Sequence, residues 1–127
     1  MAEFPKTIKG YERYDRREEN LNELASFSEL KFNWFGHGAE PFSKDVISQA
    51  TSVIEMLTVQ PEVFPALDGT IQFDFTNFED FYFEVSIGDD YYDIYIDGLI
   101  DSHYENPNKD PMLILNDIKK VLGIGKH

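Results

Sequence analysis

Three stretches between Thr70 and Gly98 alternate apolar and polar residues, which is the pattern of a β-strand with one buried face. Successive side chains on a strand point to opposite faces, so the apolar residues of each stretch share one face. Turn-forming residues separate the stretches at positions 77–80 and 88–90. The pattern predicts a three-stranded antiparallel meander. Its inner face carries Ile71, Phe73, Phe75, Phe81, Phe83, Val85, Ile87, Tyr92, Ile94 and Ile96.

The outer face of this predicted meander combines carboxylates with tyrosines. The alternation assigns to it Asp74, Tyr82, Glu84, Tyr91, Asp93, Tyr95 and Asp97. Carboxylates steer a basic partner toward a surface, and tyrosines supply rigid contact area at a small entropic cost. We therefore take these seven residues as the candidate partner-binding site.

A main helix is predicted over residues 43–58, where apolar residues recur at helical spacing. Ser43 is a favourable N-cap for it, and Asp45 lies near its positive end. Residues 62–67 predict a short edge strand, because Pro65 has no N–H to donate to a ladder. The Asp-Gly pair at 68–69 is then a strong signal for a hairpin into the meander.

The two ends of the chain give weaker patterns. Residues 1–19 are polar and of mixed charge, which predicts a flexible N-terminal arm ahead of a single domain at 20–127. Asn20 is expected to cap a short helix from Leu21 to about Leu30, and residues 101–110 are expected to form a polar loop. Asp110 and Pro111 then start a C-terminal helix that ends near residue 123.

Together these elements predict an α+β fold. A three- to four-stranded antiparallel meander carries the main helix on its inner face, and the C-terminal helix covers a remaining edge or the second end of the core. A length of 127 residues fits one domain. The chain has no cysteine, which excludes disulfides and thiolate metal sites. With neither an apolar signal-like segment near Met1 nor a membrane-length apolar run, we expect a cytoplasmic protein.

The charge of the chain is large and uneven. The net charge is −13, and residues 45–108 hold fourteen acids without one Lys or Arg. Such a chain is poorly suited to bind nucleic acid directly or to bind an anionic membrane, because both ligands require Lys and Arg. It is well suited to a basic protein partner. The alternative explanation is that the charge only confers solubility, or keeps exposed strand edges from pairing with other chains.

Residues 32–42 form the most distinctive loop, with the only Trp, two glycines and a proline. Its residues Asn33-Trp34, Gly36, Gly38-Ala39 and Pro41, followed by a helix, resemble an Asn-Trp-Asp-Gly-x-Gly-Ala-x-Pro motif of small bacterial and phage proteins without an established activity. The resemblance covers roughly residues 21–97 and departs from the motif at Phe35, where the motif has an acid. It implies the helix, the proline-containing strand and the Asp-Gly turn, and it implies no site.

Catalytic and metal-binding patterns are weak. No serine lies in a nucleophile motif, and the histidines are His37, His103 and the terminal His127. The aspartates between positions 89 and 97 do not fit a calcium-loop pattern. We therefore expect no metal and no cofactor. The alternative to partner binding is a small ligand-binding or hydrolytic domain on the 33–39 loop, with Asn33, Trp34 as a platform and His37 as a base; the structural interpretation of this loop is that Trp34 packs at the sheet–helix junction.

The leading hypothesis is a non-enzymatic acidic protein that inhibits a basic nucleic-acid-handling protein. Immunity proteins, antitoxins and phage anti-defence proteins act in this manner, some by imitating the phosphate charge of nucleic acid. The pattern makes no prediction of the oligomeric state.

Overall fold

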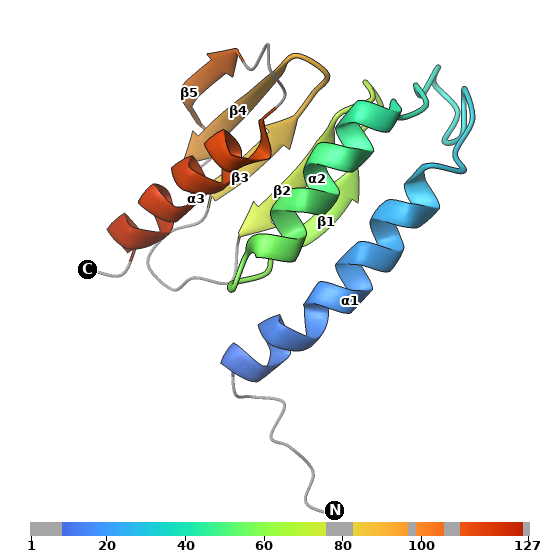
Figure 1. Ribbon diagram of the computed structural model, residues 1–127. Coiled ribbons are helices and arrows are strands. Elements are labelled where there is room, and N and C mark those ends of the chain that lie inside the picture. Colours follow the sequence, from blue (N-terminus) through green and yellow to red (C-terminus); the bar gives the residue numbers. More distant parts are fainter. Residues whose placement is uncertain (1–8, 76–82, 97–98, 106–109, 126–127) are drawn as a thin grey trace, which may run out of the picture.

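The described residues form three helices and five strands (Figure 1). The structure is a computed structural model, and it describes residues 9–75, 83–96, 99–105 and 110–125. In chain order the elements are α1 (Lys9–Phe27), α2 (Lys44–Met56), β1 (Glu62–Pro65), β2 (Ile71–Phe75), β3 (Phe83–Ile87), β4 (Tyr91–Ile96), β5 (Leu99–Glu105) and α3 (Pro111–Gly125).

The strands make one antiparallel meander in the order β1-β2-β3-β4-β5. The predicted α+β class is confirmed, but the expected polar loop after Ile100 is wrong, because β5 continues to Glu105. The strand pairing shows why the alternation of apolar and polar residues did not reveal β5. Ile94 lies opposite Ser102 whereas Tyr95 lies opposite Ile100, so a bulge shifts the pairing between the two. A bulge interrupts the alternation on which the prediction relied.

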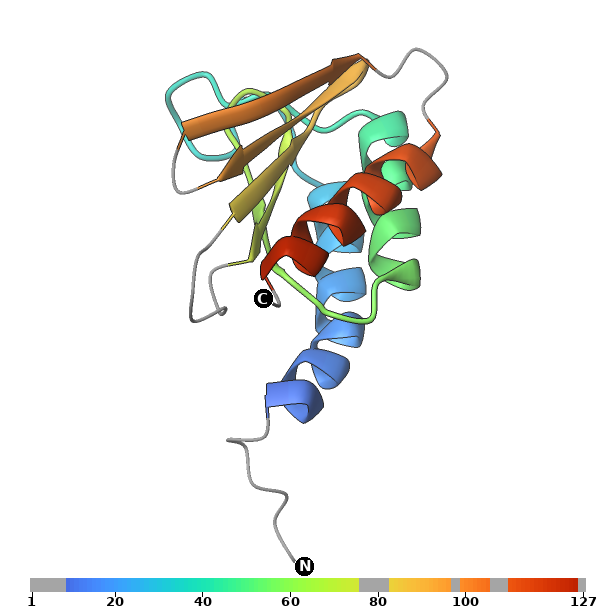
Figure 2. The same cartoon turned by 90° about the vertical axis from the view of Figure 1, so that its left-hand side faces the viewer.

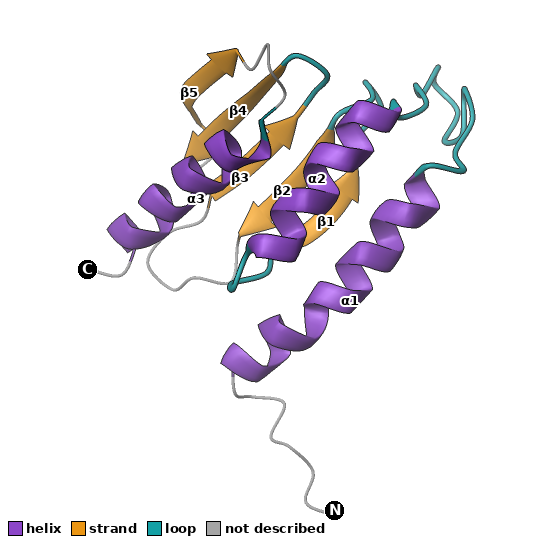
Figure 3. Ribbon diagram, in the orientation of Figure 1, coloured by secondary structure: helices purple, strands orange, loops and turns teal. Residues whose placement is uncertain are grey.

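All three helices lie on one face of the sheet (Figures 2 and 3). Strand residues on that face alternate with residues on the other, so β2 and β3 each show a buried–partly buried pattern along their length. Apolar side chains of α2 and of the strands are almost fully buried between the layers. Each such large side chain contributes about 1.5–3 kcal/mol of transfer free energy. The other face of the sheet has no helix on it among the described residues.

Local signals positioned α2 and the first hairpin as expected. The Ser43 hydroxyl accepts a hydrogen bond from the Val46 N–H at 3.1 Å and caps α2. In the hairpin, Gly69 adopts φ +89°, which favours glycine, and the Asp68 carboxylate accepts hydrogen bonds from the Thr70 N–H at 3.1 Å and its hydroxyl at 2.7 Å.

The C-terminal helix begins as predicted and packs on the core. The Asp110 carboxylate accepts a hydrogen bond from the Met112 N–H at 3.0 Å, and Pro111 is the first helical residue. Of the two expected positions, the helix takes the core rather than an edge: α3 lies beside α2 on the same face of the sheet and buries Ile114, Leu115 and Ile118 (Figure 1). The hydroxyl of Tyr92, a buried residue of β4, donates a hydrogen bond to Asp117 of α3 and so connects the two layers.

The first helix is longer than predicted. It begins at Lys9 rather than at Leu21 and ends at Phe27. Part of its packing is polar and is made with the segment that follows α2, which explains why α1 has no continuous apolar stripe in the sequence. The Asn20 side-chain amide is 1% exposed and donates hydrogen bonds to the Gln60 side-chain carbonyl at 3.0 Å and to the Pro61 carbonyl at 2.9 Å. Residues 1–8 of the expected flexible arm lie outside the described residues.

Gln60 in turn closes the carboxyl end of α2. Its amide nitrogen donates hydrogen bonds to the carbonyls of Ile54 at 3.0 Å and Leu57 at 2.8 Å. The Arg17 guanidinium donates to the Leu57 carbonyl as well. A helix end leaves its last carbonyls without intrahelical partners, and here side chains of α1 and of the following loop satisfy them.

Candidate functional site

A row of three carboxylates crosses the open face of the sheet. In the register, Glu62 lies opposite Asp74, Asp74 lies opposite Glu84, and Tyr95 lies opposite Glu84 on the next strand. Residues directly opposite have Cβ atoms only about 4.5–5.5 Å apart, and like charges in such pairs are destabilising. The sheet therefore carries two adjacent like-charge pairs, and the Arg16 guanidinium of α1 lies 3.9 Å from the Glu62 carboxylate at the end of the row. We call Glu62, Asp74 and Glu84 the acidic row.

A second row runs beside the acidic row. It consists of Phe64, Gln72, Ser86 and Asp93, one residue from each of the strands β1 to β4. Phe64 is 43% exposed, so this face also presents an aromatic ring. Asp93 is only 8% exposed although it lies on the open face. Tyr95 donates a hydrogen bond from its hydroxyl to Asp93 at 3.4 Å.

Two tyrosines on this face have raised pKa values. Burial raises the pKa of Tyr91 above its usual value of 10.0, and the charges of Asp68, Asp93 and Asp89 raise it further. Burial also raises the pKa of Tyr95, and the charge of Asp93 and its hydrogen bond with the hydroxyl add to the effect. Both hydroxyls are therefore protonated at neutral pH, and that of Tyr95 donates its proton to Asp93.

Gly88 leaves room for the ring of Tyr91. A Cβ atom built on Gly88 would lie 2.5 Å from a ring carbon of Tyr91, which is closer than any real side chain tolerates. The two residues face each other across the β3–β4 turn, where the Gly88 N–H donates to the Tyr91 carbonyl at 2.8 Å. The position of Tyr91 thus depends on a glycine at 88.

An acidic pocket of about 340 Å³ lies at this end of the sheet. Glu40, Asp68, Asp89 and Tyr91 are among its lining residues. The Ser43 hydroxyl donates a hydrogen bond to Asp89, so the N-cap of α2 also fixes one wall. The pocket connects the open face of the sheet, through Tyr91, with the loop at residues 32–42, through Glu40.

The described part of the sequence-predicted site lies on one face. Asp74, Glu84, Tyr91, Asp93 and Tyr95 all belong to the open side of β2, β3 and β4. The two remaining predicted residues, Tyr82 and Asp97, lie outside the described residues.

Sequence reasoning missed Glu62 and Phe64 of β1, and it missed the pocket. The two β1 residues could have been found from the turn at Asp68 and Gly69. A hairpin turn fixes the register, and that register puts Glu62 opposite Asp74. The pocket is formed by three loops that are distant in sequence, so no local sequence pattern predicts it.

The alternative site at residues 33–39 is a loop that is hydrogen-bonded to itself. The Asn33 side-chain carbonyl accepts from the Gly38 N–H at 2.8 Å, and the Trp34 indole N–H donates to the Glu40 carbonyl at 2.7 Å. Asn33 and His37 both adopt left-handed backbone conformations, with φ of 66° and 58°. The polar side-chain groups of Asn33 and Trp34 therefore make hydrogen bonds that hold the loop's own backbone in place.

His37 is exposed at the turn of this loop, near the ring of Phe35. Within the described residues no hydrogen bond orients its imidazole, as a general base requires. Over the same residues, no group of three or more His, Cys, Asp or Glu side chains is placed to hold a metal ion.

None of the helices described is both long enough and apolar enough to cross a membrane. Comparison with known proteins gave no significant match to a protein-family model, a curated protein or a solved structure. The resemblance of the 32–42 loop to a motif rests on its own residues.

Proposed function

We propose that the protein is a non-enzymatic inhibitor that binds a basic, nucleic-acid-handling protein through the open face of its sheet. The acidic row is the observation that supports this most strongly. Two direct like-charge pairs lie on one sheet face, and residues 45–108 contain no Lys or Arg; Arg16 of α1 lies 3.9 Å from Glu62 at one end of the row. A surface of this kind is useful to a protein whose partner supplies the missing positive charge.

The spacing of the row is of the same order as, and somewhat wider than, the axial spacing of charge along one nucleic-acid strand. Neighbouring strands lie about 4.8 Å apart, so the three carboxylates of the row repeat at that interval. A nucleic-acid strand carries one negative charge per about 3.4 Å of helix axis. A cleft lined by Lys and Arg to hold phosphates would therefore meet a comparable density of negative charge on this sheet.

The surroundings of the row resemble a protein interface rather than a purely solvated surface. Phe64, Tyr91 and Tyr95 supply aromatic area beside the carboxylates. Tyrosine is enriched among the residues that dominate binding energy, where it contributes apolar area and a hydroxyl together. The carboxylates would raise the rate of association and the selectivity for a basic partner, and the aromatic rings would supply most of the affinity.

The positive charges of the described elements lie on the helices, and Arg16 of α1 reaches the acidic row at its Glu62 end, 3.9 Å from that carboxylate. Within the described elements, Lys and Arg occur on α1, α2 and α3 and not on any of the five strands. The sheet layer is thus uniformly negative, and the helix layer behind it is mixed. A basic partner approaching the molecule would be oriented toward the sheet.

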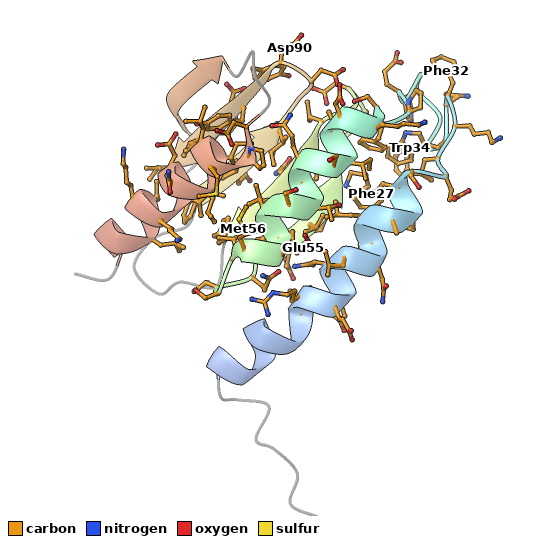
Figure 4. All side chains as sticks on the ribbon, viewed as in Figure 1. Phe27, Phe32, Trp34, Glu55, Met56 and Asp90 are labelled. Atoms are coloured by element: carbon orange, nitrogen blue, oxygen red, sulfur yellow. The ribbon has the colours of Figure 1, made fainter. Side chains whose placement is uncertain are left out.

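A paired affinity capture tests the proposal. The wild-type protein, Glu84→Lys and the control Glu55→Lys are immobilised, and proteins captured from a host lysate are eluted with a salt gradient. Glu84→Lys puts a cation opposite Asp74, which should preserve the fold while it breaks the acidic row. Glu55 is exposed on α2, in the layer behind the sheet (Figure 4).

We expect one basic nuclease or nucleic-acid-binding protein on wild type and on Glu55→Lys, released as salt screens the charges, and little of it on Glu84→Lys. Equal capture by all three forms, or capture of a partner that is neither basic nor active on nucleic acid, would contradict the proposal.

A further inference from the structure

The loop at residues 32–42, which we call the aromatic loop, exposes two phenylalanines to solvent. Phe32 is 63% exposed and Phe35 is 65% exposed, the two highest values among the large apolar side chains described. The loop lies at one end of the molecule, beyond the end of α1 (Figure 4). Two large exposed rings on one short loop are typical of a binding surface.

A series of rings connects Phe35 to the core. Phe27, which is 4% exposed, stacks on Phe42 with ring centroids 5.6 Å apart. Phe42 lies 5.8 Å from Trp34, and Trp34 lies 5.9 Å from Phe35. Aromatic pairs at these distances attract one another beyond the effect of their buried area. The exposed ring is therefore supported from below rather than carried on a loose chain.

The backbone of the aromatic loop is also fixed. The Gly36 N–H donates to the Asn33 carbonyl at 3.0 Å, and the Ala39 N–H donates to the Gly36 carbonyl at 3.1 Å. Farther along, the Glu40 N–H donates to the Leu67 carbonyl at 2.8 Å, which ties the loop to the β1–β2 turn. A loop that is ordered before binding loses little conformational entropy when it binds.

We propose that Phe32 and Phe35 are apolar anchors that insert into an apolar, basic-rimmed pocket on the same partner that the acidic row binds. This inference rests on the proposed function. Charge complementarity identifies the occupant. Glu40 belongs to the aromatic loop and also lines the acidic pocket with Asp68 and Asp89, so the base of the loop is negative and continuous with the sheet face. One partner can therefore contact both surfaces.

The same charges disfavour the two other occupants of an exposed aromatic loop. A second copy of this chain would bring its own net charge of −13 against the acids at the base of the loop. An anionic membrane would meet the same repulsion. Both are nevertheless outcomes that the experiment distinguishes.

The test uses photo-crosslinking followed by titration. Benzoylphenylalanine replaces Phe35 in one sample and Tyr95 in another, and each is irradiated in host lysate. We expect both positions to cross-link to the same basic protein. Capture alone does not decide the question, so that protein is then purified and titrated with wild type, Phe35→Ala, Glu84→Lys and Leu113→Ala. Leu113 is a control of comparable exposure, at 46%, on α3.

Phe35→Ala should weaken binding at least tenfold, and this factor should be the same at low and high salt because the lost contact is apolar. The loss caused by Glu84→Lys should shrink as salt rises, and Leu113→Ala should bind like wild type. A thermal midpoint of Phe35→Ala near that of wild type confirms that the fold is intact.

Each other result overturns the inference. If Phe35→Ala binds the partner with full affinity, Phe35 is not an anchor, and the proposed function is unaffected. Cross-linking of position 35 to a second copy or to lipid would assign the loop a different occupant. Absence of a basic partner at both positions would overturn the proposed function and the inference together.

Discussion

Neutralising Glu84 should make the protein more stable. Glu84 lies directly opposite Asp74, and Glu84→Gln removes one of the two like-charge pairs of the acidic row while keeping the shape of the side chain. Two unit charges about 5 Å apart in water repel by about 0.8 kcal/mol. Measured cross-strand pairs contribute about 0.2–1 kcal/mol, in agreement. For a domain of this length, a gain of that size raises the thermal midpoint by about 1–4 °C.

The assay is thermal and urea unfolding of wild type, Glu84→Gln and the control Glu29→Gln, at low salt and at 1 M salt. Glu29 is exposed in the turn after α1 and lies outside the sheet, so its neutralisation should change little. The gain from Glu84→Gln should disappear at 1 M salt, where the Debye length is about 3 Å.

A loss of stability in Glu84→Gln at low salt, or a gain that is independent of salt, would refute the reasoning. Either result would mean that the charge of Glu84 is compensated within the fold, and the acidic row would then need no partner to explain it.

Three further predictions follow from other parts of the molecule. Asn20→Ala should lower the free energy of unfolding by about 1–3 kcal/mol in urea titrations, because it leaves the buried Gln60 and Pro61 carbonyls without their donor, whereas the exposed Asn22→Ala should not. Gly88→Ala should displace the Tyr91 ring, seen as a changed near-ultraviolet circular dichroism spectrum that Ser86→Ala does not reproduce. The folded-state pKa values of Tyr91 and Tyr95 are raised, so their contribution to stability is complete below pH 10 and is lost as pH rises through the folded values. Absorbance titration should show these two tyrosines ionising above the usual value of 10.0, and Tyr91→Phe should reduce the loss of stability at alkaline pH.

The sequence predicted the parts of the fold that local chemistry determines. Ser43 caps α2, Gly69 turns the first hairpin, and the alternation around Phe73 and Val85 sets which side of the sheet is buried. Because a strand has a period of two, that alternation also assigned Asp74 and Glu84 to one face. What the alternation did not reveal was that the register places them directly opposite each other.

The remaining features depend on contacts between distant segments. The start of α1 was missed because Asn20 packs through hydrogen bonds to residues some forty positions away, and polar packing leaves no apolar stripe to read. The strand β5 was missed because of the bulge at Ile94 and Tyr95. Asp93 was expected as an exposed contact, yet it is 8% exposed, since a strand pattern gives the face of a residue and not its neighbours.

Competition with nucleic acid tests the central claim most directly. The captured basic protein is first bound to a fluorescent oligonucleotide, and wild type or Glu84→Lys is then added while the anisotropy is followed. The account predicts that wild type releases the oligonucleotide at about one equivalent and that Glu84→Lys does not. Release by both forms alike, or a ternary complex in which the oligonucleotide stays bound, would contradict the claim that the acidic row occupies a nucleic-acid site.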